Sequence, residues 1–437
     1  MGLMKRWVFF ISILFLFACK PAKVDTWFSA VKAESYFKTV KELCDADNGK
    51  LWGENLYGPI MYIDTKNRFI YANSQDKEGL LRLREGVYSG IVPKEKWIAN
   101  TAIDFGGTLY AVVPLPDEEK PSEIVNRTIH SLFHCFQERS GLAPSSYNTR
   151  HLNDKNARLY LKLEWKALMS AIKSDGDMRN QAIRDALIFR GARRELFPGA
   201  VADENKFEDY EGLTTFTYLK LGTAGNEELS KEILSYLDRI YNNFSYAHAY
   251  GFIHGALYAY LMQIKGFDFK SIRNPDFDLG MATSELYGIN LPEHCRDVAG
   301  SLAMNYDISL IMAEESKHNE MINANVEKII NEFIKKPVVF LQMESPNFSF
   351  EPEDINSLDS LGTLYKKLRV SDNWGKLVVN EGGALLTNDL KTLRISAKDL
   401  DLERNRISGS GWSLMLNEGW QAVEDGDNFT IRKQQVH

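Results

Sequence analysis

The chain has little cysteine and no block of basic residues. Its 437 residues include 4 cysteines, and no two of these form a Cys-x-x-Cys pair. This spacing excludes a disulfide framework and a zinc knuckle as the basis of the fold, although one disulfide could form in an oxidising compartment. The formal net charge is −7. A mildly acidic chain without a basic cluster has no electrostatic footprint for nucleic acid, so we expect no such partner.

Long hydrophobic runs are also missing. The apolar run at residues 7–18 covers 12 residues, fewer than the roughly 20 that a membrane-spanning helix needs. Lys5 and Arg6 precede it, and this order is typical of an export signal. The run ends in LFAC at residues 16–19, which resembles the bacterial lipobox. The resemblance implies that residues 1–19 are a lipoprotein signal and that Cys19 carries lipid.

We therefore expect a membrane-anchored lipoprotein of the bacterial cell envelope, on the periplasmic or surface side, held to the lipid bilayer through Cys19. An ordinary secretory signal with an incidental cysteine is the alternative. The composition of the whole chain, 44% hydrophobic and 25% charged, is that of an ordinary globular protein.

The order of strand-like and helix-like segments along the sequence predicts an α+β protein. The chain is too long for one hydrophobic core, so we expect several domains. Residues 20–115 contain a tether, a first helix and short strands, so this region is β-rich. The strands at residues 60–64 and 68–72, separated by Thr65-Lys66-Asn67, predict a hairpin. Residues 116–340 are mainly helical. Residues 345–437 alternate short apolar strands with glycine-containing turns, which predicts a small all-β domain.

The segment 126–137, NRTIHSLFHCFQ, contains the most informative motif. His130 and His134 are four residues apart, so both imidazoles leave the same side of a helix. We expect them to face solvent or a cleft, on a side shared with Gln137 and away from the apolar stripe of Val125, Ile129, Leu132 and Phe136. This is the ligand spacing of an H-E-x-x-H zinc site, but Ser131 stands where the glutamate would be. Two ordinary surface histidines are the alternative.

A strand at residues 108–114 leads through a polar loop into the histidine helix. A strand beside the metal helix is the layout of zinc peptidases, in which the strand edge binds an extended substrate by β-addition.

A second helix has an acidic pattern. Glu204, Glu208, Glu211 and Thr215 are spaced 4, 3 and 4 residues apart, which predicts that they share one face. Stacked carboxylates repel one another unless a cation or a basic partner lies opposite. A solvated acidic stripe is the equally simple alternative.

Two further helices carry polar groups of interest. We interpret the arginines of the helix at residues 178–196 as a solvated face with internal ion pairs. The helix at residues 245–262 contains small residues that allow close packing, and its Tyr250 and His254 lie either in the core or in a site.

Together, the histidine helix and the acidic helix resemble the gluzincin zinc metallopeptidases. The chain looks closest to a group of uncharacterised, exported bacterial proteins of this type. The resemblance to that group is broader and covers residues 98–265. It implies zinc as cofactor, with His130 and His134 as two ligands and Glu211 in YEGL as the third. Two departures are clear: Ser131 replaces the general-base glutamate, and Thr215 replaces a carboxylate that helps to orient the ligands.

These departures leave three hypotheses. The first is a lipoprotein with a degenerate zinc site, impaired in peptidase activity, that serves as a binding or scaffold protein for a peptide or protein ligand. Ser131→Glu would then restore some activity if the cleft survives. The second is a working zinc hydrolase in which Glu208 supplies the base and Tyr250 stabilises the oxyanion. The third is a metal-free envelope lipoprotein whose function lies in the C-terminal β region.

Overall fold

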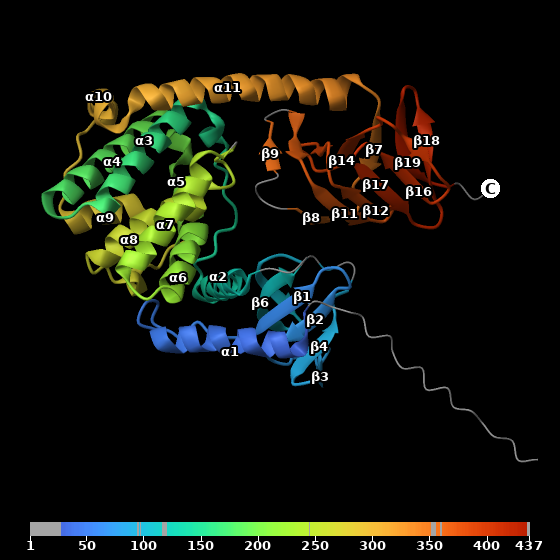
Figure 1. Cartoon of the computed structure of the whole chain (residues 1–437), viewed down its shortest axis with the longest axis horizontal. Helices are drawn as coiled ribbons and strands as arrows, with labels where there is room; N and C mark the ends of the chain where they lie inside the picture. Colours follow the sequence, from blue (N-terminus) through green and yellow to red (C-terminus); the bar gives the residue numbers. More distant parts are fainter. Residues whose placement is uncertain are drawn as a thin grey trace, which may run out of the picture.

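The computed structural model describes residues 28–93, 96, 98–115, 120–243, 245–350, 355–358 and 361–434. The predicted signal and Cys19 lie outside these residues. The α+β prediction is confirmed, since N-terminal strands are followed by a helical region and by a C-terminal all-β region (Figure 1). Among the described helices, none is both long and apolar enough to cross a membrane.

The N-terminal region consists of helix α1 (Ala30–Asp47) and a six-stranded sheet in the order β3-β4-β2-β1-β6-β5. β1 and β2 form the predicted hairpin, whereas β1 and β6 run parallel. Alternate residues of β1 point to opposite faces, so Tyr62 joins the core beneath the helices and Ile63 joins a smaller cluster on the other face. The strands are β1 (Ile60–Asp64), β2 (Phe69–Ala72), β3 (Arg82–Arg84), β4 (Val87–Ile91), β5 (Thr101–Phe105) and β6 (Thr108–Leu115).

The strand beside the histidine helix is not an edge strand, which corrects the sequence-based expectation. β6 lies between β1 and β5, and its backbone groups therefore pair on both sides. The chain reverses at Gly106-Gly107, where both φ values are positive, at +57° and +72°, in a region that favours glycine. This tight turn folds β5 back onto β6, so β5 provides the edge.

The helical region and the N-terminal sheet share one hydrophobic core, which extends in sequence from Phe28 to Ile311. α2 lies between the sheet and the other helices (Figure 1). The α-helices are α2 (Pro121–Ser140), α3 (Lys155–Lys173), α4 (Gly176–Leu196), α5 (Val201–Phe207), α6 (Leu213–Gly222), α7 (Asn226–Tyr241), α8 (Tyr250–Ile264), α9 (Leu279–Tyr287), α10 (Cys295–Leu302) and α11 (Ile308–Ile330).

Short helices of other types connect them. The 3-10 helices are η1 (Arg150–Asn153), η2 (Pro198–Ala200), η4 (Phe269–Ser271) and η5 (Ala303–Tyr306), and the π-helices are η3 (Glu208–Gly212) and η6 (Asn331–Lys335). The three described cysteines, Cys44, Cys135 and Cys295, are buried and free, so the structure forms no disulfide among them.

α11 leads from the helical region to the C-terminal strands (Figure 1). These strands begin at Val338, a few residues earlier than predicted, and form two sheets in the orders β18-β19-β7-β14-β13-β10-β9 and β15-β16-β17-β12-β11-β8. Trp374 and Trp412 are buried in their core, and Trp420 packs against it. β19, near the end of the chain, pairs in parallel with β7.

The C-terminal strands are β7 (Val338–Gln342), β8 (Asn347–Ser349), β9 (Ile355–Ser357), β10 (Thr363–Tyr365), β11 (Leu368–Asp372), β12 (Gly375–Val379), β13 (Ala384–Leu386), β14 (Thr392–Ser396), β15 (Asp401–Leu402), β16 (Arg406–Gly409), β17 (Trp412–Leu416), β18 (Trp420–Asp425) and β19 (Asn428–Lys433).

Candidate metal centre

α2 brings His130 and His134 together. Their Nε2 atoms are 3.0 Å apart, and the two rings lie nearly perpendicular to each other. The expectation that both face solvent or a cleft is wrong for His134, whose side chain is 1% exposed, because α6 and η3 pack against this side of α2. His130 is 14% exposed. Burial lowers the pKa of His130 well below its ordinary value, with smaller contributions from His134 and Arg127, so this imidazole is neutral near pH 7.

Glu211 completes the cluster from the π-helix η3. Its Oε2 atom lies 3.7 Å from His130 Nε2 and 3.6 Å from His134 Nε2. One ligand atom from each of the three residues lies within 4.8 Å of the others. Glu211 Oε2 is buried and accepts no hydrogen bond from the described residues. A buried carboxylate oxygen without a donor is costly, and two imidazoles with one carboxylate form a typical zinc ligand set. The residues therefore fit a divalent metal ion.

Glycines in η3 and α8 position the turn that carries Glu211. A Cβ atom at Gly212 would lie 2.5 Å from the Cα atom of Gly255, and one at Gly255 would lie 2.3 Å from the carbonyl oxygen of Glu208. Neither position has room for a side chain. The backbones of η3 and α8 are thus in direct contact, which confirms the predicted close packing by small residues.

Aromatic rings pack around the two histidines. Tyr210 stacks on His134 with ring centroids 4.2 Å apart, and Phe252 stacks on His130 at 6.5 Å. Neither contact is predicted by the sequence. Tyr210 precedes Glu211 directly, and Phe252 lies in the predicted small-residue helix, but nothing in the spacing of these residues indicates their contact with the histidines.

Ser131 lies on the side of α2 that faces the sheet. Its Oγ donates a hydrogen bond of 2.9 Å to the carbonyl oxygen of Val112 in β6, and its side chain is fully buried. Because the hydroxyl is held by β6 and has no proton affinity near neutral pH, Ser131 provides no general base.

Glu208 and Tyr250 are held in a different network. Glu208 accepts hydrogen bonds from Arg190 at 2.7 and 2.9 Å and from the Tyr250 hydroxyl at 2.9 Å. The Tyr250 hydroxyl also lies 3.2 Å from the carbonyl oxygen of Glu204. Both side chains are fully buried, and neither belongs to the cluster of His130, His134 and Glu211.

The prediction that the acidic residues share one face is therefore wrong. The chain forms i→i+5 hydrogen bonds at residues 208–212, so the α-helical spacing does not apply there. Glu204 and Glu208 point toward arginines, whereas Glu211 points toward the histidines. The predicted role of Glu208 as an alternative base gains no support from this placement. The same holds for the predicted role of Tyr250 as an oxyanion stabiliser.

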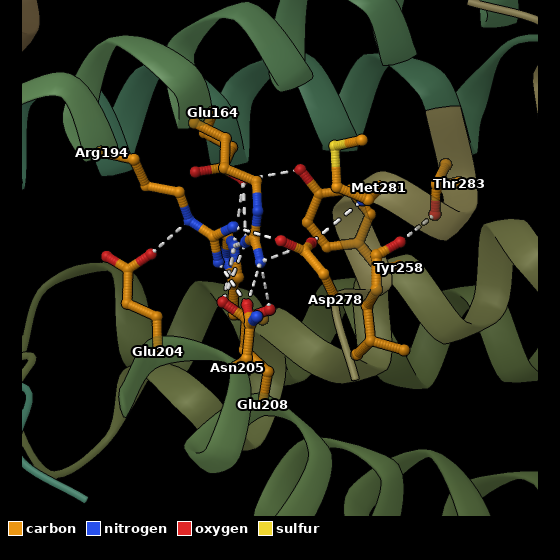
Figure 2. A network of polar contacts seen from close by, with 12 residues as sticks. Glu164, Arg194, Glu204, Asn205, Glu208, Tyr258, Asp278, Met281 and Thr283 are labelled. Atoms are coloured by element: carbon orange, nitrogen blue, oxygen red, sulfur yellow. Dashed lines mark hydrogen bonds and ion pairs between the residues drawn. The ribbon is translucent and has the colours of Figure 1, made fainter. Parts of the chain in front are cut away.

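The arginines of α4 are also not a solvated face. Arg190 and Arg193 are 3% and 0% exposed. Glu164 in α3, Glu204 in α5 and Glu208 in η3 form ion pairs with these guanidinium groups. Glu204 also pairs with Arg194, as Figure 2 shows. Burial disfavours ionisation of Glu164, but Arg193, the contact with His254 and, more weakly, Arg190 outweigh this effect and keep the Glu164 pKa well below its usual range. These ion pairs connect α4 to α3, α5 and η3.

His254 belongs to the same network. The Trp165 indole donates to His254 Nδ1 at 2.9 Å, so the ring carries its proton on Nε2, which lies 3.0 Å from Glu164 Oε1. His254 is fully buried and has a structural place in the core.

Comparison with known proteins finds no family model, no curated protein and no solved structure that matches this chain. The resemblance to gluzincins therefore rests on the residues of the chain and on the geometry described above.

Proposed function

We propose that the protein is a membrane-anchored lipoprotein that binds zinc through His130, His134 and Glu211 and is impaired in peptidase activity. In this proposal it acts as a binding or scaffold protein for a peptide or protein ligand. The observation that carries the proposal is the convergence of two imidazole Nε2 atoms and the donor-free Glu211 Oε2 atom at one point. Three protein ligands with a further open position are typical of catalytic zinc sites.

The chemistry at the site is limited by the residues around it. A zinc ion held there would supply a Lewis acid for a bound oxygen ligand. His130 and His134 would donate lone pairs, and Glu211 would supply negative charge. Ser131 donates a hydrogen bond to β6, and Glu208 forms an ion pair with Arg190, so neither one supplies a base to this cluster.

Zinc content tests the metal site. We expect about one zinc ion per wild-type chain after purification and dialysis, measured by mass spectrometry, and its loss in His130→Ala. His294→Ala is the matched control, because His294 is exposed and lies at the N-cap position of α10 without a capping hydrogen bond from its side chain; this variant should keep its zinc. A wild-type chain that binds no zinc even when zinc is added would contradict the proposal and favour the metal-free hypothesis.

The anchor is tested separately. Cys19→Ala should release the protein from the membrane fraction or block its maturation. Processing and fractionation identical to those of the wild type would rule out the lipid anchor without affecting the metal site.

A further inference from the structure

Gln137 connects the two elements that carry the candidate metal centre, namely α2 with both histidines and η3 with Glu211. Its side chain is 1% exposed and lies three residues after His134 on α2. Gln137 Oε1 is 2.7 Å from His134 Nδ1. Gln137 Nε2 donates two hydrogen bonds, each 3.1 Å long, to the carbonyl oxygens of Asp209 and Tyr210 in η3. All these polar contacts are inside the protein.

These contacts determine the orientation of the amide. Carbonyl oxygens only accept hydrogen bonds, so the NH₂ group of Gln137 must face Asp209 and Tyr210, and Oε1 must face His134. The Thr214 hydroxyl lies 3.4 Å from Oε1, but it donates its single hydrogen to the closer carbonyl oxygen of Tyr210, so it does not decide the orientation.

The orientation of Gln137 in turn determines the tautomer of His134. An amide oxygen can only accept, so the short contact requires a proton on His134 Nδ1. A neutral imidazole with its proton on Nδ1 keeps its lone pair on Nε2. His134 Nε2 is the atom that faces His130 and Glu211. The ring is thus prepared to offer Nε2 to a metal ion.

The same amide also holds the carboxylate ligand. Asp209 and Tyr210 immediately precede Glu211, so the two bonds from Gln137 tie this part of η3 to α2. We propose that Gln137 is a positioning residue that sets the tautomer of His134, fixes the distance between the histidines and Glu211, and thereby raises zinc affinity. This inference rests on the proposed zinc site.

Two substitutions separate the two actions of Gln137. Gln137→Met has a similar shape but neither accepts from His134 nor donates to η3. Gln137→Glu keeps an oxygen toward His134 Nδ1 but cannot donate both hydrogen bonds to η3. Gln181→Met is the matched control, because Gln181 is exposed on α4 and bonds to Asp185.

The experiment measures the zinc dissociation constant by chelator competition on the full chain, and the His134 tautomer by NMR of the metal-free, ¹⁵N-histidine-labelled protein. Loss of a group that orients a metal ligand costs about 10- to 100-fold in affinity. We expect such a loss, and loss of the Nδ1-protonated form, in Gln137→Met. Gln137→Glu should keep this tautomer and bind zinc with intermediate affinity, and Gln181→Met should match the wild type.

The outcomes distinguish this inference from the proposed function. Unchanged zinc affinity in Gln137→Met, or an unchanged His134 tautomer, would overturn the inference while leaving the zinc site intact. A wild-type chain that binds no zinc would overturn the proposed function and, with it, the effect on affinity. If Gln137→Met does not fold, Gln137→Glu decides: an affinity equal to that of the wild type, or a switched tautomer, contradicts the role of Gln137.

Discussion

Ser131 occupies a buried position at which an H-E-x-x-H motif would carry a carboxylate. Its hydroxyl donates a hydrogen bond to the backbone carbonyl oxygen of Val112 in β6. The position is sealed between α2 and the sheet, with no exposed surface on the side chain. A longer acidic side chain would therefore meet a carbonyl oxygen and a packed sheet rather than open solvent.

This environment changes the outcome expected for Ser131→Glu. The sequence alone predicts a gain in peptidase activity; with the buried position known, we predict a rate gain far below the 10²- to 10⁴-fold typical of a positioned base. Overpacking and burial of a carboxyl group should lower the free energy of unfolding by about 2–4 kcal/mol. Urea unfolding and a peptidase assay measure both effects.

Ser131→Ala is the control for this substitution. It removes one hydrogen bond and should cost only about 1 kcal/mol. A Ser131→Glu protein that is as stable as the wild type and cleaves peptides rapidly would show that the carboxylate reaches the metal centre.

At the level of elements, the position of Glu211 depends on the backbone contact between η3 and α8. Gly255→Ala would place a methyl group 2.3 Å from the Glu208 carbonyl oxygen, so one of the two helices must move. We predict a loss of about 3 kcal/mol in the free energy of unfolding and a weaker zinc affinity, because Glu211 would be displaced.

Gly300→Ala provides the comparison, since Gly300 lies in α10 and a Cβ atom there would meet no neighbouring group within 4 Å. At this position the alanine should stabilise the helix, by up to about 1 kcal/mol, and leave zinc affinity unchanged. Equal effects of the two substitutions in urea unfolding would contradict the importance of the η3–α8 contact.

The sequence and its resemblance predicted the three residues that cluster, His130, His134 and Glu211, but not the structure that brings them together. The four-residue spacing of His130 and His134 is a local property of an α-helix, so it could be read directly. The π-helix at Glu208 could not, because it depends on tertiary contacts with Arg190 and with the glycines of α8. The burial of the arginines could not be predicted either, because their carboxylate partners lie on other helices, and the packing of those helices against α4 is a tertiary property.

The sheet illustrates the same limit. Alternation and turn residues predicted the β1–β2 hairpin and the strand at residues 108–114. The order of strands within the sheet, which leaves β5 rather than β6 at the edge, depends on which strands pair over long distances. No local pattern in the sequence reports this.

At the level of the whole molecule, the buried carboxylates link stability to pH. Burial opposes ionisation of Asp278, but Arg190 and Arg194 outweigh it and lower the Asp278 pKa to about 2. The pKa of Glu204 is also held low, because Arg193, His151 and Arg194 outweigh the effect of burial. Carboxyl groups with a lowered pKa in the folded state stabilise it above their unfolded pKa of about 4.

We therefore predict that the contribution of these groups is complete at pH 5–7 and is lost as the pH falls from about 4 toward 2. Asp278 alone should account for about 2 kcal/mol of this loss. Urea unfolding at a series of pH values measures the effect, and Asp278→Asn should flatten part of the slope. A free energy of unfolding that does not change between pH 5 and pH 3 would contradict the strength of the network.

The parallel pairing of β19 with β7 has a consequence for the order in which the protein can be completed during synthesis. β7 begins the C-terminal region at Val338, yet one of its two neighbours in the sheet, β19, begins 90 residues later at Asn428. The candidate metal ligands at residues 130, 134 and 211 are all synthesised more than 200 residues earlier than β19. These three residues can thus come together on a growing chain, whereas the C-terminal sheet must wait, with one edge of β7 unpaired, until β19 has been made.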